Sequence, residues 1–277
     1  MPKLPSSLVA LSFESSLLST FLKGSSFAAL PLSTKDVDIP YFVQKKIGNH
    51  YLLLMAEGGS DYNHAVTALT AKSLWGPYVP CTINPVLTHR HLGKDYPVQS
   101  LGHADLVQTP TGDWYAVFLG KRIVEGGLVP LGRETFLCEV SFQNGEPIFN
   151  PGIGVIGNRL KRPLLPWTPV SKTDKQNDFE SSALSPEWAT MRIPEQPLHH
   201  FADGNLFLSL RPEMADSLVC PSMLLHRVHS HNFSAITTMT FSTCQANEWA
   251  GLVLYRTAKG YYSLLKGKNE IRLTIDK

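Results

Sequence analysis

The sequence predicts an all-β protein, and three observations carry that prediction. Short apolar runs of strand length recur along the chain, turn residues separate them, and no helical periodicity links them. The 277 residues include 20 Gly, 20 Pro and 10% aromatic residues, which is typical of turn-rich β structure. With 43% hydrophobic residues, the chain can bury one large core or two ordinary ones.

Turn signals flanked by apolar runs predict the hairpins of the first half. Hairpins are expected around Gly48-Asn49, around residues 111–113 and around Asn144-Gly145, and residues 65–69 form a further expected strand. This regular spacing favours antiparallel meanders. On pattern alone a sandwich, a barrel and a propeller all remain open.

A second β segment follows a proline-rich stretch. Asp203-Gly204 predicts a hairpin, and residues 235–241, 250–255, 261–265 and 271–277 are strand-like. Alternation at 238–241 indicates one buried face, as in a two-sheet sandwich.

Composition excludes several classes of function. The net charge is +2 and no Lys/Arg cluster dominates, so neither nucleic acid nor an anionic membrane is an expected partner. No apolar run approaches the roughly 20 residues that a membrane span needs. The four cysteines lie far apart without a CxxC pair, which argues against a zinc site and a disulfide framework and favours buried free thiols.

Residues 1–36 are an unassigned tail. Lys3 supplies a positive end, but Glu14 interrupts the apolar centre that a signal peptide requires. A weak helix or an unstructured tail is the expectation, and neither the compartment nor the oligomeric state can be inferred.

Polar residues gather at the ends of the apolar runs between 101 and 137. They are His103, Asp105, Arg133 and Glu134. A β scaffold often exposes its working side chains at such positions, although satisfied polar groups in turns would give the same pattern.

Six segments in this order resemble glycoside hydrolase family 43, the β-xylosidase and α-arabinofuranosidase branch. They are YLLLMAEGG (51–59), HAVT (64–67), SLWGPY (73–78), NPVLTHR (84–90), GHADLV (102–107) and GRETF (132–136). Four later segments resemble the concanavalin-like sandwich that follows the propeller of those β-xylosidases. They are DF (178–179), LSPEW (184–188), LFL (206–208) and AGLVLY (250–255).

The resemblance implies a domain organisation. Residues 37–157 are expected to form the C-terminal part of a five-bladed β-propeller, residues 158–177 a linker, and residues 178–277 an incomplete β-sandwich. The expected fold is therefore a partial propeller followed by a truncated sandwich.

The resemblance also implies inverting hydrolysis of a terminal sugar from xylan- or arabinan-derived oligosaccharides. Such chemistry needs a general acid and a general base about 6.5–9.5 Å apart; the family adds a third carboxylate that tunes the acid. Asp38 aligns with the general acid, usually a Glu, and has one methylene less. Nothing in residues 1–36 resembles the base or the tuning Asp, so the 277 residues alone are expected to be inactive.

The binding half of the pocket is better represented. By position, His103 corresponds to a histidine on the pocket floor, Arg133 to an arginine that faces the substrate, and Ser60 to a small hydroxyl residue near the sugar. Glu134 and Asp105 are expected to hold neighbouring strands. No cofactor is expected. Calcium near the central histidine is conceivable by resemblance, but no Asp-rich loop supports it.

Two further interpretations stay open beside a glycosidase. The chain could be a non-catalytic descendant that binds sugars through His103, Arg133 and aromatic side chains such as Trp75 and Trp114, for which core packing is the alternative role. It could also be a purely structural β protein.

Overall fold

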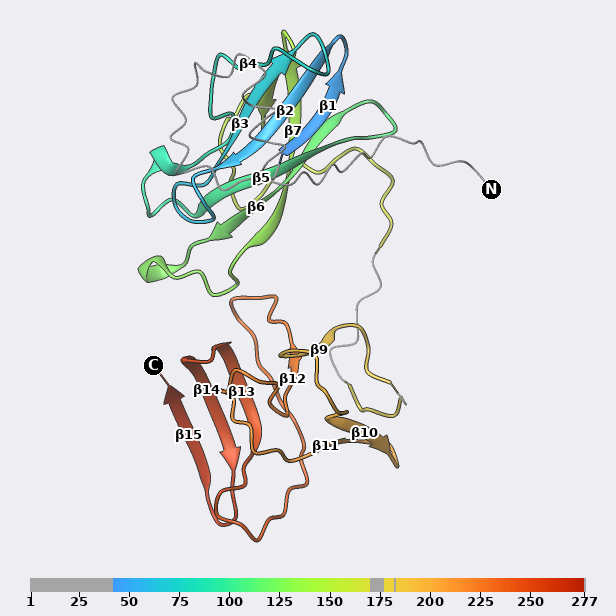
Figure 1. Cartoon of the computed structure of the whole chain (residues 1–277), viewed down its shortest axis with the longest axis vertical. Helices are drawn as coiled ribbons and strands as arrows, with labels where there is room; N and C mark the ends of the chain where they lie inside the picture. Colours follow the sequence, from blue (N-terminus) through green and yellow to red (C-terminus); the bar gives the residue numbers. More distant parts are fainter. Residues whose placement is uncertain (1–41, 170–176, 182, 277) are drawn as a thin grey trace, which may run out of the picture. The chain divides into compact units, whose positions relative to one another are not determined.

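The computed structural model describes residues 42–169, 177–181 and 183–276 (Figure 1). Asp38 and the tail 1–36 lie outside the described residues. The described part contains fifteen strands and two 3-10 turns, η2 (Arg90–Leu92) and η3 (Glu125–Gly127), which confirms the all-β prediction. None of its helical segments is long and apolar enough to cross a membrane.

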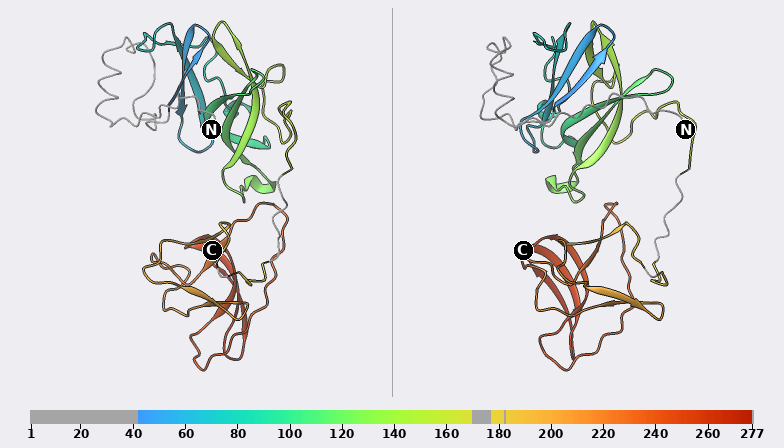
Figure 2. Two further views of the ribbon diagram at one scale, coloured as in Figure 1. Left: turned by 90° about the vertical axis from the view of Figure 1, so that its right-hand side faces the viewer. Right: turned by 45° about the vertical axis from the view of Figure 1, so that its right-hand side comes forward.

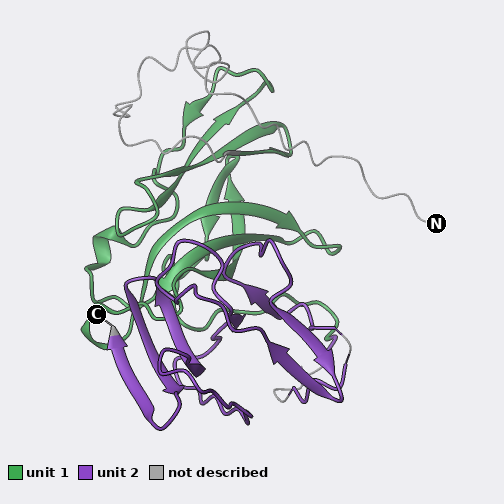
Figure 3. Ribbon diagram, turned by 60° about the horizontal axis from the view of Figure 1, so that its bottom comes forward, with its two compact units in different colours: residues 1–167 green, residues 168–277 purple. Residues whose placement is uncertain are grey.

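The chain divides into two compact units, residues 1–167 and residues 168–277 (Figure 3). We call them unit 1 and unit 2 and describe each by itself.

Unit 1 consists of two four-stranded antiparallel sheets (Figure 2). The strands of the first sheet, in spatial order, are β1 (Phe42–Ile47), β2 (His50–Glu57), β3 (Ala65–Ala71) and β4 (Val79–Pro80). Those of the second are β5 (Val98–Gln108), β6 (Trp114–Arg122), β7 (Glu134–Gln143) and β8 (Glu146–Phe149). Each sheet is a simple meander, the form of a propeller blade.

The turn signals of the sequence set these meanders. Gly48 (φ 57) joins β1 to β2, and Asn144 (φ 54) with Gly145 (φ 85) joins β7 to β8. Positive φ at such positions is what a tight hairpin requires. These hairpins, and the one between β5 and β6, are confirmed.

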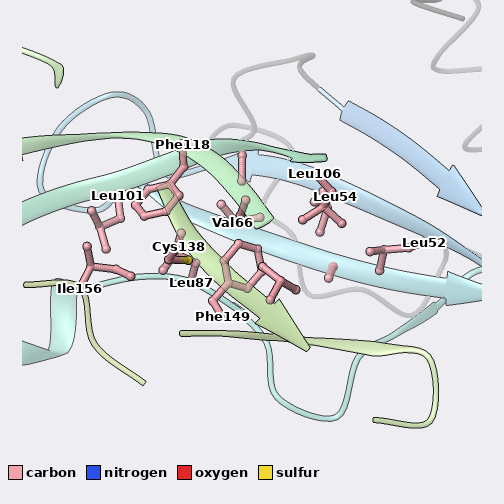
Figure 4. Close-up of a cluster of buried hydrophobic side chains, with 14 of the residues drawn as sticks. Leu52, Leu54, Val66, Leu87, Leu101, Leu106, Phe118, Cys138, Phe149 and Ile156 are labelled. Atoms are coloured by element: carbon pink, nitrogen blue, oxygen red, sulfur yellow. The ribbon is translucent and has the colours of Figure 1, made fainter. Parts of the chain in front are cut away.

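The core of unit 1 lies between the two sheets (Figure 4). Leu54 and Val66 come from the first sheet, and Phe118 and Cys138 from the second. Ile156, beyond β8, is also fully buried in this cluster. Because strands alternate, every second residue of β2, β3 and β6 enters the core.

His89 fastens the segment after β8 to the first part of the chain. Its Nδ1 lies 2.7 Å from the carbonyl oxygen of Val98, and its Nε2 accepts a hydrogen bond from the Ile156 N–H at 3.0 Å. Nδ1 therefore carries the proton, since a carbonyl can only accept. Burial lowers the pKa of His89, which agrees with a neutral ring.

The outer edge of β3 is closed mostly by side chains and loops, because β4 has only two residues. The amide of Asn84 accepts from the Ala68 N–H at 3.0 Å and donates to the Ala68 carbonyl at 3.1 Å. Val66 exchanges backbone hydrogen bonds with Val86 and Leu87. These groups take the place of a neighbouring strand.

Unit 2 contains one three-stranded sheet and two two-stranded sheets. The three-stranded meander is β13 (Ala250–Thr257), β14 (Gly260–Lys266) and β15 (Ile271–Asp276). The smaller sheets pair β9 (Trp188–Thr190) with β12 (Leu224–His226), and β10 (His199–Ala202) with β11 (Asn205–Leu208). The hairpin at Asp203-Gly204 is confirmed.

One face of the three-stranded sheet is apolar and exposed. The strand register places Leu252 beside Leu264 and Leu264 beside Leu273. We call this the β13–β15 apolar face, and its members are Leu252, Leu254, Tyr262, Leu264, Leu273 and Ile275, all at least 36% exposed.

Two expectations for the polypeptide were wrong. Residues 235–241 alternate like a strand but form none, because no described segment pairs with them, and a strand needs a neighbour for its backbone hydrogen bonds.

All four cysteines are free thiols, but only Cys81 and Cys138 are buried, and burial raises the pKa of each to about 12. Cys244 is exposed.

Candidate functional site

The candidate site is an open hollow of about 350 Å³ over β5, β6 and the start of β7. It is lined by His103, Asp105, Leu106, Val107, Val117, Phe118, Leu119 and Thr135. Five of these eight residues are apolar, and His103, Asp105 and Thr135 are the polar ones. Of the predicted substrate-binding residues His103, Arg133 and Ser60, all within the described part of the chain, only His103 belongs to this lining.

An irregularity in β5 presents His103. The pairing of β5 with β6 shifts register between Gln99 and Gly102 and again between Gly102 and Asp105. His103 has φ 57, a left-handed conformation that non-glycine residues seldom adopt. Such a bulge re-aims a side chain, and His103 is exposed between the buried Gly102 and Ala104.

The positive charge of Arg133 acts on the imidazole of His103. Burial is the main cause that lowers the pKa of His103, and the positive charge of Arg133 is the second. Arg133 is exposed, directly before β7, and within the described part of the chain its guanidinium forms neither a hydrogen bond nor an ion pair. Its donors therefore remain available for an acceptor.

Neighbouring charges have structural roles, as expected. Glu134 binds Arg122 with two carboxylate oxygens, at 2.6 Å to Nη2 and 2.9 Å to Nε. This fixes the start of β7 to the end of β6. Asp105 lies 3.4 Å from Lys45 Nζ, an ion pair between β5 and β1.

The turn between β2 and β3 carries Ser60. Ser60 is exposed and is not part of the lining of the hollow. Two ion pairs anchor this turn: Glu57 to Arg90 at 3.2 Å, and Asp61 to Lys121 at 3.2 Å. The hydrogen bond from Lys121 is the largest cause that lowers the pKa of Asp61.

His64 ends the same turn, and sequence reasoning did not single it out. It is only 4% exposed, and its Nδ1 lies 3.2 Å from the carbonyl oxygen of Glu57. Burial lowers its pKa most, and His103 and Arg133 contribute in the same direction. The protonation of these three basic side chains is therefore linked through their charges.

The aromatic candidates differ from each other. Trp75 is 75% exposed, in the connection between β3 and β4. Trp114 packs edge-to-face on Phe142 against the core, the structural role that the sequence left open.

A metal finds no ready ligand set here. Among the residues that the structure describes, no group of three or more His, Cys, Asp or Glu side chains is placed to hold an ion. Among the described residues, no such side-chain cluster supports the calcium that the resemblance suggested near the central histidine.

Comparison with known proteins identifies both halves of the chain. Residues 33–147 match the model of glycosyl hydrolases family 43, and residues 176–275 match the β-xylosidase C-terminal concanavalin A-like domain. A xylosidase/arabinosidase of Butyrivibrio fibrisolvens is 36% identical over 91% of this chain and 50% of its own length. A non-reducing end α-L-arabinofuranosidase of Bacteroides ovatus is 34% identical over 89% of this chain and 46% of its own.

Solved structures agree with these matches. The xyloglucan-locus GH43B protein of Bacteroides ovatus superposes with a TM-score of 0.72 and 33% identity, over 84% of this chain and 47% of that one. The GH43 protein BlXynB of Bacillus licheniformis gives 0.72 and 28% identity, over 85% and 47%. The chain spans about half the length of the relatives it matches. Unit 1 carries two propeller blades and unit 2 a sandwich-type domain, and the chain belongs to glycoside hydrolase family 43.

Proposed function

We propose that this chain supplies the substrate-holding wall of an inverting glycosidase that acts on terminal xylose or arabinose of xylan- or arabinan-derived oligosaccharides. His103 and Arg133 contact the sugar hydroxyls. The observation that carries the proposal is the left-handed His103, aimed into an open hollow beside a guanidinium whose donors have no described acceptor.

The chemistry of the two side chains suits a sugar. Arg133 can donate a pair of hydrogen bonds to adjacent hydroxyl oxygens. The lowered pKa of His103 keeps its ring neutral near pH 7, so one nitrogen donates and the other accepts. The apolar part of the lining, which includes Val117 and Leu119, suits the carbon face of a pyranose or furanose ring.

Family membership supports the reaction class. The matched relatives carry the names xylosidase and arabinosidase. Inversion requires an acid and a base that flank the scissile bond. Asp38 is the proposed acid position, and Ser60 is a proposed further contact at the rim. None of the 277 residues is identified as a counterpart of the general base or of the tuning Asp. We therefore expect the isolated polypeptide to bind sugar without hydrolysing it.

The binding test uses thermal shift and calorimetry of the 277-residue chain with xylose, arabinose and xylobiose. Arg133→Ala should weaken binding about tenfold or more, because a charge-assisted hydrogen bond contributes roughly 1.5–3 kcal/mol. Arg159→Ala, which removes an exposed arginine elsewhere in unit 1, is the matched control and should bind like the parent. Equal binding by both variants would contradict the role of Arg133.

Turnover is tested with aryl β-xylosides and aryl α-arabinofuranosides. We expect none from the 277 residues alone. Hydrolysis that Asp38→Ala abolishes would overturn this expectation and identify Asp38 as a working general acid.

A further inference from the structure

The ring of His64 touches β5 at Gly102, the residue before His103. Its Nδ1 faces the carbonyl oxygen of Glu57 at 3.2 Å, so Nδ1 carries the proton and Nε2 is the bare nitrogen. Within the described residues, the buried Nε2 has no hydrogen-bond partner. This contrasts with His89, whose two nitrogens are both bonded. The Nε2 edge of His64 is thus held in place by packing.

That edge fills the space above Gly102. A Cβ on Gly102 would lie 2.1 Å from both Cδ2 and Nε2 of His64, far inside any real contact. Gly102 does not have a positive φ, so the imidazole, and not the backbone conformation, requires a glycine there. The ring lies where the β5–β6 ladder breaks, because the register shifts on both sides of Gly102.

His103 follows directly, with φ 57. A left-handed non-glycine residue costs about 1–3 kcal/mol and persists only where its surroundings fix it. The ring edge of His64 against Gly102 is a contact of that kind, since β5 cannot flatten at Gly102 without moving a buried ring. His64 is itself anchored through Glu57 and through its backbone, whose N–H bonds to Asp61 and whose carbonyl accepts from Thr88.

We propose that His64 is a positioning residue: its ring edge, seated against Gly102, holds the β5 bulge that turns the His103 side chain into the hollow. This deepens the proposed function and rests on it for the purpose that His103 serves. The shape of the ring performs the task, and its proton does not.

The test separates shape from hydrogen bonding with two variants of the full chain. His64→Asn can keep the donor to Glu57 but leaves the space above Gly102 empty. His64→Phe fills that space but lacks the donor. Both variants remove the titrating ring of His64, so any direct charge effect of that ring on His103 is lost equally in the two.

The first readout is the pKa of His103, followed by NMR of the imidazole resonances. We expect His64→Phe to keep the lowered pKa of His103, and His64→Asn to let it rise toward the ordinary value of about 6.5. Sugar affinity should fall about tenfold in His64→Asn and at most about threefold in His64→Phe. Melting temperatures are recorded for both.

Each outcome is decisive. Equal pKa values of His103 in the two variants, whatever their melting temperatures, would make His64 a packing residue only and overturn the proposal. Should His64→Asn fail to fold, His64→Phe decides alone, because an ordinary pKa of His103 in that variant contradicts positioning by shape. If the parent chain binds no sugar, the proposed function fails while the pKa comparison still tests the positioning.

Discussion

The two units of the chain are both built from antiparallel meanders, yet they treat their apolar side chains in opposite ways. Among the described residues, every buried hydrophobic side chain except Leu198 belongs to unit 1. Unit 2 instead exposes the six side chains of the β13–β15 apolar face. A sheet hides one face only when a second layer packs on it. In unit 1 each sheet supplies that layer to the other, and this rigid support is what a strained residue such as His103 requires.

The largest expected effect that tests this contrast is core truncation. Phe118→Ala in unit 1 should reduce the free energy of unfolding by about 3–5 kcal/mol. Leu264→Ala in unit 2 should change it by less than about 1 kcal/mol, because Leu264 is already 49% exposed. Hydrogen exchange with mass spectrometry reports each unit separately. Similar losses in both would show that the apolar face of unit 2 is covered in solution.

An intermediate effect concerns pH and unit 1. Burial lowers the pKa of His64, His89 and His103, so the unfolded chain binds protons more readily than the folded one. The stability from their neutral forms is therefore fully present above the unfolded value of about 6.5, and is lost as the pH falls through the folded values. Unit 1 should melt at progressively lower temperature between about pH 7 and about pH 5.

His89 gives the variant for that measurement. His89→Phe leaves the Val98 carbonyl and the Ile156 N–H without their partner and should destabilise unit 1 by roughly 1–3 kcal/mol at neutral pH. Its melting temperature should also depend less on pH, because one titrating ring is gone. His229→Ala, at an exposed histidine of unit 2, should leave the melting of unit 1 and its pH dependence like those of the parent. A slope in His89→Phe as steep as in the parent would exclude His89 as a source of the pH dependence.

The smallest expected effect is on the β13–β15 apolar face. Leu273→Thr combined with Ile275→Thr should change the free energy of unfolding by no more than about 0.5 kcal/mol, because threonine keeps strand propensity and both positions are exposed. The same change should reduce binding of a hydrophobic dye and self-association, measured by fluorescence and light scattering. Val117→Thr, a single substitution at an exposed valine of unit 1, serves as the comparison for dye binding. Unchanged dye binding would mean that this face is not accessible.

The fold was largely predictable because its turns are local. Gly48 and the Asn144-Gly145 pair have the positive φ that their hairpins demand, and residue type reports this directly. Residues 235–241 were mispredicted because alternation describes one strand, whereas a strand exists only with a partner that the sequence does not name.

The candidate site was predictable only in part. His103 and Arg133 followed from resemblance to a family, and their assigned roles stay predictions. His64 was missed because its contact with Gly102 joins segments from two different sheets. The available signal was a glycine directly before a histidine in a strand, but a glycine does not reveal which distant side chain occupies its space.

The closed margin of β3 has a consequence for how this chain can meet others. An unpaired strand margin is a template on which another polypeptide can continue the sheet. At Ala68 both backbone groups are already taken by the one amide of Asn84, and Val66 is engaged by residues 86 and 87. Growth of fibres or swapped dimers by strand addition is therefore blocked at this edge. At its middle, the side chain of Asn84 alone occupies both backbone groups that an added strand would need.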